Sequence, residues 1–186
     1  MNKNYRNIKK ELDDYANSGI RKSSKHIVHM NVNDDSNFLS VFSASKSPVI
    51  SQEVADFIEA STHAAKPTTQ LTLKIQSSCI DDAEKTLYRQ AIKEYYTEKY
   101  IAAKQELKKN YRIAYILGTL GVLVLALAVF LEYRHESVIW AEVIDIVAWV
   151  FLWEAVDVFC LETRKLKANS QRYISYVAME VEFEDN

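Results

Sequence analysis

The stretch SVIWAEVIDIVAWVFLWEAVDVFCL, residues 137–161, is mostly apolar but carries four acidic residues. It follows RIAYILGTLGVLVLALAVFL, residues 112–131, in which no charged residue comes after the initial arginine. Each stretch has about the 20 residues that a helix needs to cross a hydrocarbon layer of ~30 Å. The pattern predicts a two-helix transmembrane hairpin, with spans at about 112–131 and 138–161. The alternative is a soluble protein with a buried pair of apolar helices.

Positively charged residues predict the orientation of the two spans. The short connection at 132–136 has two acidic residues and a single arginine, whereas the outer flanks are basic. Because basic flanks stay on the cytoplasmic side, we expect a multi-pass protein of the cell membrane with both termini cytoplasmic. The flanking basic residues are Lys104, Lys108, Lys109 and Arg112 before the first span, and Arg164, Lys165, Lys167 and Arg172 after the second.

The remaining sequence predicts an α+β cytoplasmic head of about four strands with helices on one face. Residues 1–80 would form its N-terminal part, with helices at 4–17 and 51–64, a hairpin of strands at 25–32 and 38–44, and a strand at 69–77. An amphipathic helix over 81–111 would lead to the membrane hairpin at 112–161. Residues 162–186 would extend the second helix and end in a strand that completes the sheet.

Composition argues against several classes of function. The net charge of -2 disfavours a broad nucleic-acid-binding surface. Three glycines cannot build a glycine-rich phosphate loop. The two cysteines, Cys79 and Cys160, lack the spacing of a zinc site or a disulfide framework. We therefore expect no metal, no cofactor and no catalytic constellation.

Two acidic residues of the second span lie near the predicted membrane interfaces. Glu142 is expected near the outer interface and Asp157 near the inner one, where each could pair with a basic residue. The possible partners are Arg134 and His135 outside, and Arg112 and Arg164 inside.

The other two acidic residues lie deeper, where charge is costly. Asp145 and Glu154 are each expected about 6–8 Å from the membrane midplane, at 1.5 Å of rise per residue. Tyr115 and Thr119 are the nearest polar candidates for Glu154, while Asp145 faces only valine, leucine and alanine. Protonation, a bound cation, or polar partners from another chain could each satisfy such groups; they could also be neutral packing contacts without transport.

Small residues in the first span point to close helix packing. Ala114 and Gly118 are four residues apart and Gly121 is nearby, a pattern that lets two helices approach closely. The contact could lie within the hairpin or between copies of the chain.

These patterns favour a membrane protein without enzymatic activity that serves as an interaction, scaffold or sensory module. Its partners would be a second copy or another membrane protein. The alternative is an oligomeric proton or cation conductor in which Asp145 and Glu154 carry the charge.

Overall fold

The structure is a computed structural model that describes residues 25–44, 48–66, 69–134 and 138–184. The chain divides into two compact units. Unit 1 comprises residues 1–102 and 169–186, and unit 2 comprises residues 103–168. The helix expected at 4–17 lies outside the described residues.

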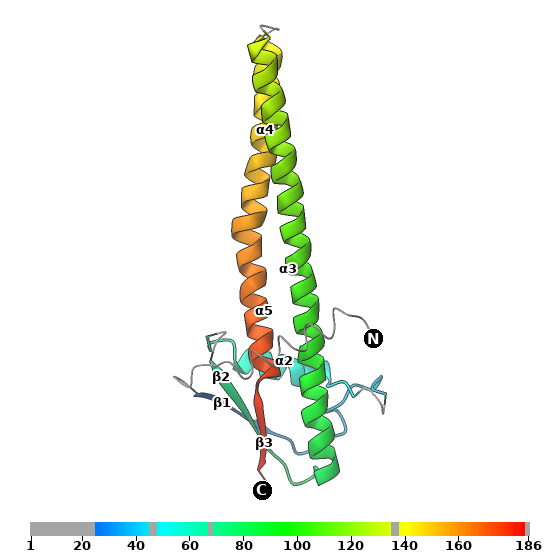
Figure 1. Ribbon diagram of the computed structural model, residues 1–186. Helices are drawn as coiled ribbons and strands as arrows, with labels where there is room; N and C mark the ends of the chain where they lie inside the picture. Colours follow the sequence, from blue (N-terminus) through cyan, green and yellow to red (C-terminus); the bar gives the residue numbers. More distant parts are fainter. Residues whose placement is uncertain (1–24, 45–47, 67–68, 135–137, 185–186) are drawn as a thin grey trace. The chain divides into compact units, whose positions relative to one another are not determined.

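Unit 1 contains a three-stranded parallel sheet (Figure 1). Its strands are β1 (Lys25–Asn31), β2 (Gln70–Gln76) and β3 (Glu180–Glu184), with β2 in the centre. Val28 pairs with Leu73, and Leu73 pairs in turn with Val181, so the apolar side chains of the three strands share one face. The C-terminal strand therefore joins the sheet, as the alternating pattern of the tail predicts.

The helices are α2 (Gln52–Ser61), α3 (Asp82–Tyr133), α4 (Val138–Asp157) and α5 (Thr163–Val177), with a π-helical turn, η1 (Val158–Glu162), between α4 and α5. Ser51 caps α2 by accepting a hydrogen bond from the Val54 amide. At the start of α3 the Glu84 carboxylate accepts a hydrogen bond from the Asp81 amide, as in a capping box. No proline interrupts the 52 residues of α3, so the helix continues from unit 1 into unit 2.

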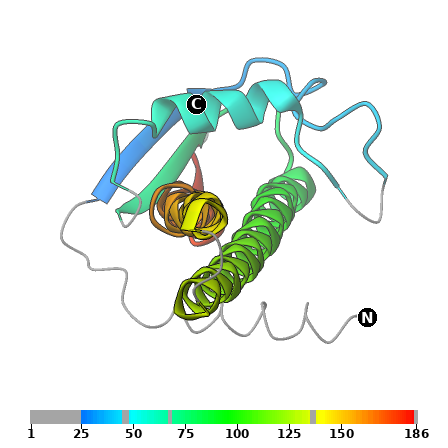
Figure 2. The same ribbon diagram turned by 90° about the horizontal axis from the view of Figure 1, so that it is seen from above.

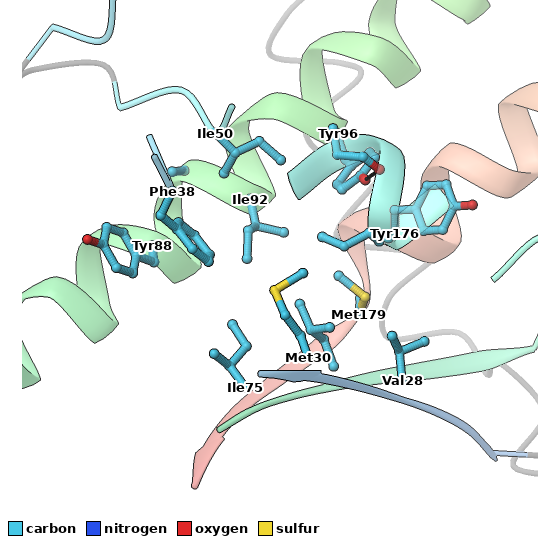
Figure 3. Packing of buried hydrophobic residues seen from close by; sticks show 14 of the residues in the cluster. Val28, Met30, Phe38, Ile50, Ile75, Tyr88, Ile92, Tyr96, Tyr176 and Met179 are labelled. Atoms are coloured by element: carbon cyan, nitrogen blue, oxygen red, sulfur yellow. Dashed lines mark hydrogen bonds between the residues drawn. The ribbon is translucent and has the colours of Figure 1, made fainter. Parts of the chain in front are cut away.

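One face of the sheet is covered by the core of unit 1 (Figures 1 and 2). Figure 3 shows Met30 and Ile75 of the strands facing Ile92 and Tyr96 of α3 and Tyr176 of α5. The helical residues of this core come from α2, the first turns of α3 and the end of α5. Tyr88 and Tyr96, which recur at helical spacing on the amphipathic part of α3, thus supply core.

The expected four-stranded head is wrong in one element, residues 38–44. This segment forms no strand, only an isolated antiparallel bridge between Leu39 and Ile50. Phe38 is instead buried and stacked on Tyr88 at 4.2 Å between ring centroids, and the Tyr88 hydroxyl donates to Asp35. Tight turns and burial of Phe38 replace the antiparallel pairing, so β1 pairs with β2 in parallel and α2 makes the crossover.

The expected hairpin of two spans is also corrected. The predicted helix at 81–111 and the first span are a single helix, α3. Among the described residues, α3 is the one helix long and apolar enough to cross a membrane. The 20 residues of α4 include four carboxylates, which leave it short of that apolarity.

The acidic row of β3 lies on the face of the sheet opposite the core. Lys74 of the central strand pairs with both Glu182 and Glu184, and Lys25 pairs with Glu180 at 3.7 Å. The hydrogen bond from Lys74 is the main cause that lowers the pKa of Glu184. The row therefore forms a cross-strand charge ladder with lysines.

Burial across β2 predicts where the sheet is sensitive to mutation. Leu73→Ala removes a fully buried side chain from the central strand and should destabilise unit 1 by about 2–5 kcal/mol. Ile27→Ala, at an edge position 42% exposed, should cost less than about 1 kcal/mol. Hydrogen exchange of the β2 amides in detergent measures both. Equal losses of protection would contradict the described core.

Candidate functional site

The candidate site lies in unit 2, where α3 and α4 pack against each other as an antiparallel pair. Small residues form the closest contacts. The Cα of Gly121 is so near α4 that an added Cβ would lie 2.8 Å from Leu152 Cγ. An added Cβ at Gly118 would lie 3.8 Å from the Cβ of Ala155, an ordinary contact. Gly121 therefore fixes the separation of the two helices at this level.

The same helix pair is joined nearer the α5 end by an aromatic and a polar contact. The rings of Tyr111 and Phe159 meet edge to face, with their centroids 5.9 Å apart. The Asn110 amide donates a hydrogen bond of 2.9 Å to the Glu162 carboxylate. Together with the glycine contacts, these pairs set the register of α3 against α4.

That register places the deeper acidic residues beside apolar parts of α3. Counting along both helices from the contact of Gly121 with Leu152, at 1.5 Å of rise per residue, Glu154 lies at the level of Thr119. The same count places Asp145 at the level of Ala128. Ala128 and Ala148 are buried between the helices. Asp145 is half-buried and Glu154 is exposed on the surface of the pair.

None of the four acidic side chains of α4 has a hydrogen bond or ion pair within the described part of the chain. The Thr119 hydroxyl, a predicted partner of Glu154, donates instead to the backbone carbonyl of Tyr115 at 2.8 Å. The Tyr115 side chain is 76% exposed. The structure likewise forms none of the ion pairs proposed from the sequence for Glu142 and Asp157 with Arg134, Arg112 and Arg164, and His135 lies outside the described residues.

An apolar groove runs along the surface of the helix pair, with a volume of about 780 Å³. Its walls combine small side chains with aromatic ones. They include Ala114, Gly118, Val122, Ala155, Phe159 and Cys160. The groove offers shape and apolar contact, and the carboxylates of α4 are absent from its walls.

The π-helical turn η1 follows the last acidic residue of α4. The Thr163 amide and its hydroxyl both donate to the carbonyl of Val158, the hydroxyl at 3.0 Å. This turn was not predicted, because apolar periodicity does not distinguish π from α geometry over five residues. The sequence feature that could have indicated the turn is Thr163, whose hydroxyl bonds the carbonyl five residues earlier.

Across the described ranges, no group of three or more His, Cys, Asp or Glu side chains is placed to hold a metal ion. Cys79 and Cys160 are free and exposed. The acidic residues of α4 are spread along the helix and do not converge on one point.

Comparison of the chain with protein-family models, curated proteins and solved structures finds no match.

The two glycines of α3 form a matched pair for testing the helix contact. Gly121→Ala should destabilise the α3–α4 pair by about 1–3 kcal/mol, since the new Cβ overlaps Leu152. Gly118→Ala should be tolerated because its Cβ meets only ordinary contact. Thermal unfolding in detergent, followed by the fluorescence of the three tryptophans, all on α4, measures the difference.

A second substitution checks the assigned clash. In the background of Gly121→Ala, Leu152→Ala removes the atoms that the new Cβ would meet and should recover part of the lost stability. Equal effects of Gly118→Ala and Gly121→Ala would contradict the described packing.

Proposed function

We propose that the protein is anchored in a membrane through α3 and acts there as a non-enzymatic interaction module. The exposure of α3 carries this proposal. Only 17% of its most apolar 18-residue window is buried within the chain, whereas the core helix of a soluble protein would be mostly buried. Leu123 and Phe130 are both more than half exposed. Such a surface is stable against lipid or against another apolar helix.

We further propose that α4, although its four carboxylates make it less apolar than the span in α3, returns through the same membrane, with both chain ends on the cytoplasmic side. Contacts of Gly121 with Leu152 and of Tyr111 with Phe159 support an antiparallel return. Lysine and arginine are concentrated before the apolar half of α3 and after α4, which supports the orientation.

The acidic side chains of α4 supply the binding specificity in this proposal. A carboxylate near the centre of a membrane helix costs about 2.5–3.5 kcal/mol on insertion scales. Asp145 and Glu154 have no polar partner in the described chain that would offset this cost. Each therefore gains most from a donor or a cation on another molecule.

The partner that fits best is a different membrane protein with a lysine or arginine in its spanning helix. Residues 113–131 contain no basic side chain, so a second copy of this chain would bring carboxylates together without a counter-charge. A basic residue from another protein would neutralise a carboxylate in a medium of low dielectric constant, where ion pairs are strong. Apolar contact along the groove of α3 and α4 would add to this interaction.

Proton or cation conduction remains the second candidate, and the unpaired state of Asp145 favours it. Conduction needs several copies, because two helices cannot enclose a pore. Trp149 and Trp153 also interrupt the acidic side of α4, so a continuous polar path is not evident within one copy.

A model partner helix tests the proposal directly. The protein is reconstituted in vesicles with a dansyl-labelled polyleucine helix that carries one lysine near its middle. The tryptophans of α4 serve as energy donors. Energy transfer should exceed that to the same helix with leucine in place of lysine, and the double substitution Asp145→Asn and Glu154→Gln should weaken the association about tenfold, the value of one charged hydrogen bond.

Two outcomes would count against the interaction module. Equal energy transfer to the lysine and leucine helices would show that the carboxylates do not contribute to binding. Proton or cation flux in vesicles that is lost in Asp145→Asn would favour the conductor. Glu132→Gln, at an exposed position just beyond the apolar stretch of α3, is the matched control and should change neither result.

A further inference from the structure

A small cavity of about 250 Å³ lies within unit 1. It is formed by the C-terminal end of α2 and the last two turns of α5. Polar side chains dominate its lining, which includes Glu59, His63, Asn169, Arg172, Tyr173 and Tyr176.

Arg172 is the group in this cavity whose hydrogen-bonding capacity is largely unused. A guanidinium has five N–H donors. One nitrogen of Arg172 donates to the His63 backbone carbonyl at a long 3.5 Å. Within the described chain, no carboxylate oxygen lies within 4.0 Å of this guanidinium. The side chain is partly buried, so its charge is only partly screened by water.

The carboxylate of Glu59 lines the same cavity and also acts electrostatically on Lys99. Burial lowers the pKa of Lys99, yet its interactions with Tyr95, Tyr173 and Glu59 outweigh burial and the pKa is raised. Lys99 and Glu59 therefore attract each other. Among the lining residues, the guanidinium of Arg172 is the group with a permanent positive charge and unused donors.

Other donors surround Arg172. The side chains of Asn169 and Tyr173 line the cavity and have no side-chain hydrogen bond among the described residues. The Tyr176 hydroxyl is occupied, because it lies 2.8 Å from the Thr62 hydroxyl in a buried hydrogen bond. Tyr176 therefore forms a fixed wall, while the guanidinium, an amide and a hydroxyl remain for a ligand.

We infer that this cavity binds a phosphate group through Arg172, assisted by Asn169 and Tyr173. The planar fork of arginine matches phosphate oxygens bidentately, and donors from several directions suit a tetrahedral anion. The phosphate could belong to a soluble phosphorylated molecule or to a phospholipid headgroup. Phosphate binding here is independent of any membrane interaction by the carboxylates of α4.

Thermal stability of the full chain in detergent, titrated with inorganic phosphate against chloride at matched ionic strength, tests this site. A ligand that binds the folded state raises the melting temperature in proportion to its occupancy. The phosphate-dependent rise should be lost, or need about tenfold more phosphate, in Arg172→Gln. Arg164→Gln on the same helix lies outside the cavity and should retain it.

Two substitutions with opposite expected effects on phosphate affinity distinguish phosphate binding from a purely structural role of Arg172 at the end of α2. Glu59→Gln removes a negative charge from the lining and should lower the phosphate concentration needed for half the rise. Tyr173→Phe should raise it without unfolding the chain. No phosphate-dependent rise in the unmodified protein, or an equal rise in Arg172→Gln, would overturn the inference.

The source of the phosphate is distinguished by two probes. Glycerol 1-phosphate is compared with nanodiscs of phosphatidylcholine with and without phosphatidic acid. A rise with glycerol 1-phosphate that depends on Arg172 assigns a soluble ligand. A rise in the phosphatidic acid nanodiscs alone, again dependent on Arg172, assigns a lipid headgroup.

Discussion

The chain that leaves β2 at Gln76 must return to the level of Thr72 before it can form β3 at Glu180, since the two strands pair in parallel. All of α3, α4 and α5 lies between those points. The chain segment between β2 and β3 therefore includes the whole of unit 2. Leu73 and Ile75, which are fully buried in β2, belong to one core with the start of α3 and the end of α5.

This arrangement ties the two ends of unit 2 to one small core. α3 leaves unit 1 as an unbroken helix, and α5 re-enters it with Ile174 and Tyr176 buried. Stability of unit 1 therefore depends on both chain segments that connect it to the apolar helix pair.

Much of unit 1 could be predicted from local pattern. Alternation of Leu71, Leu73 and Ile75 located β2, and the alternating tail located β3, since both strands bury one face. Residues 38–44 misled the prediction because their β-favouring residues include Val41 and Phe42, which are almost fully exposed, whereas Phe38 enters the core. Strand pairing is a non-local property, and the parallel direction could not be read from the segments themselves.

The candidate site was predictable in composition but not in contacts. The length and apolarity of residues 112–131, and the carboxylates of α4, were evident from sequence because charge is rare in such stretches. Partners for those carboxylates were not, since side-chain direction depends on helix register, and Thr119 bonds its own helix instead. The cavity at Arg172 brings together residues more than a hundred positions apart, which no local pattern reveals.

The central proposal is that α4, with its carboxylates, enters a membrane beside α3, and the tryptophans of α4 test it most directly. Single-tryptophan variants that retain Trp149 or Trp153 are reconstituted in vesicles of lipids brominated at defined depths along the acyl chain. Strong quenching of both by deeply placed bromine is the predicted result. Fluorescence that the brominated lipids leave unquenched, with emission typical of water-exposed indole, would contradict the membrane location of α4.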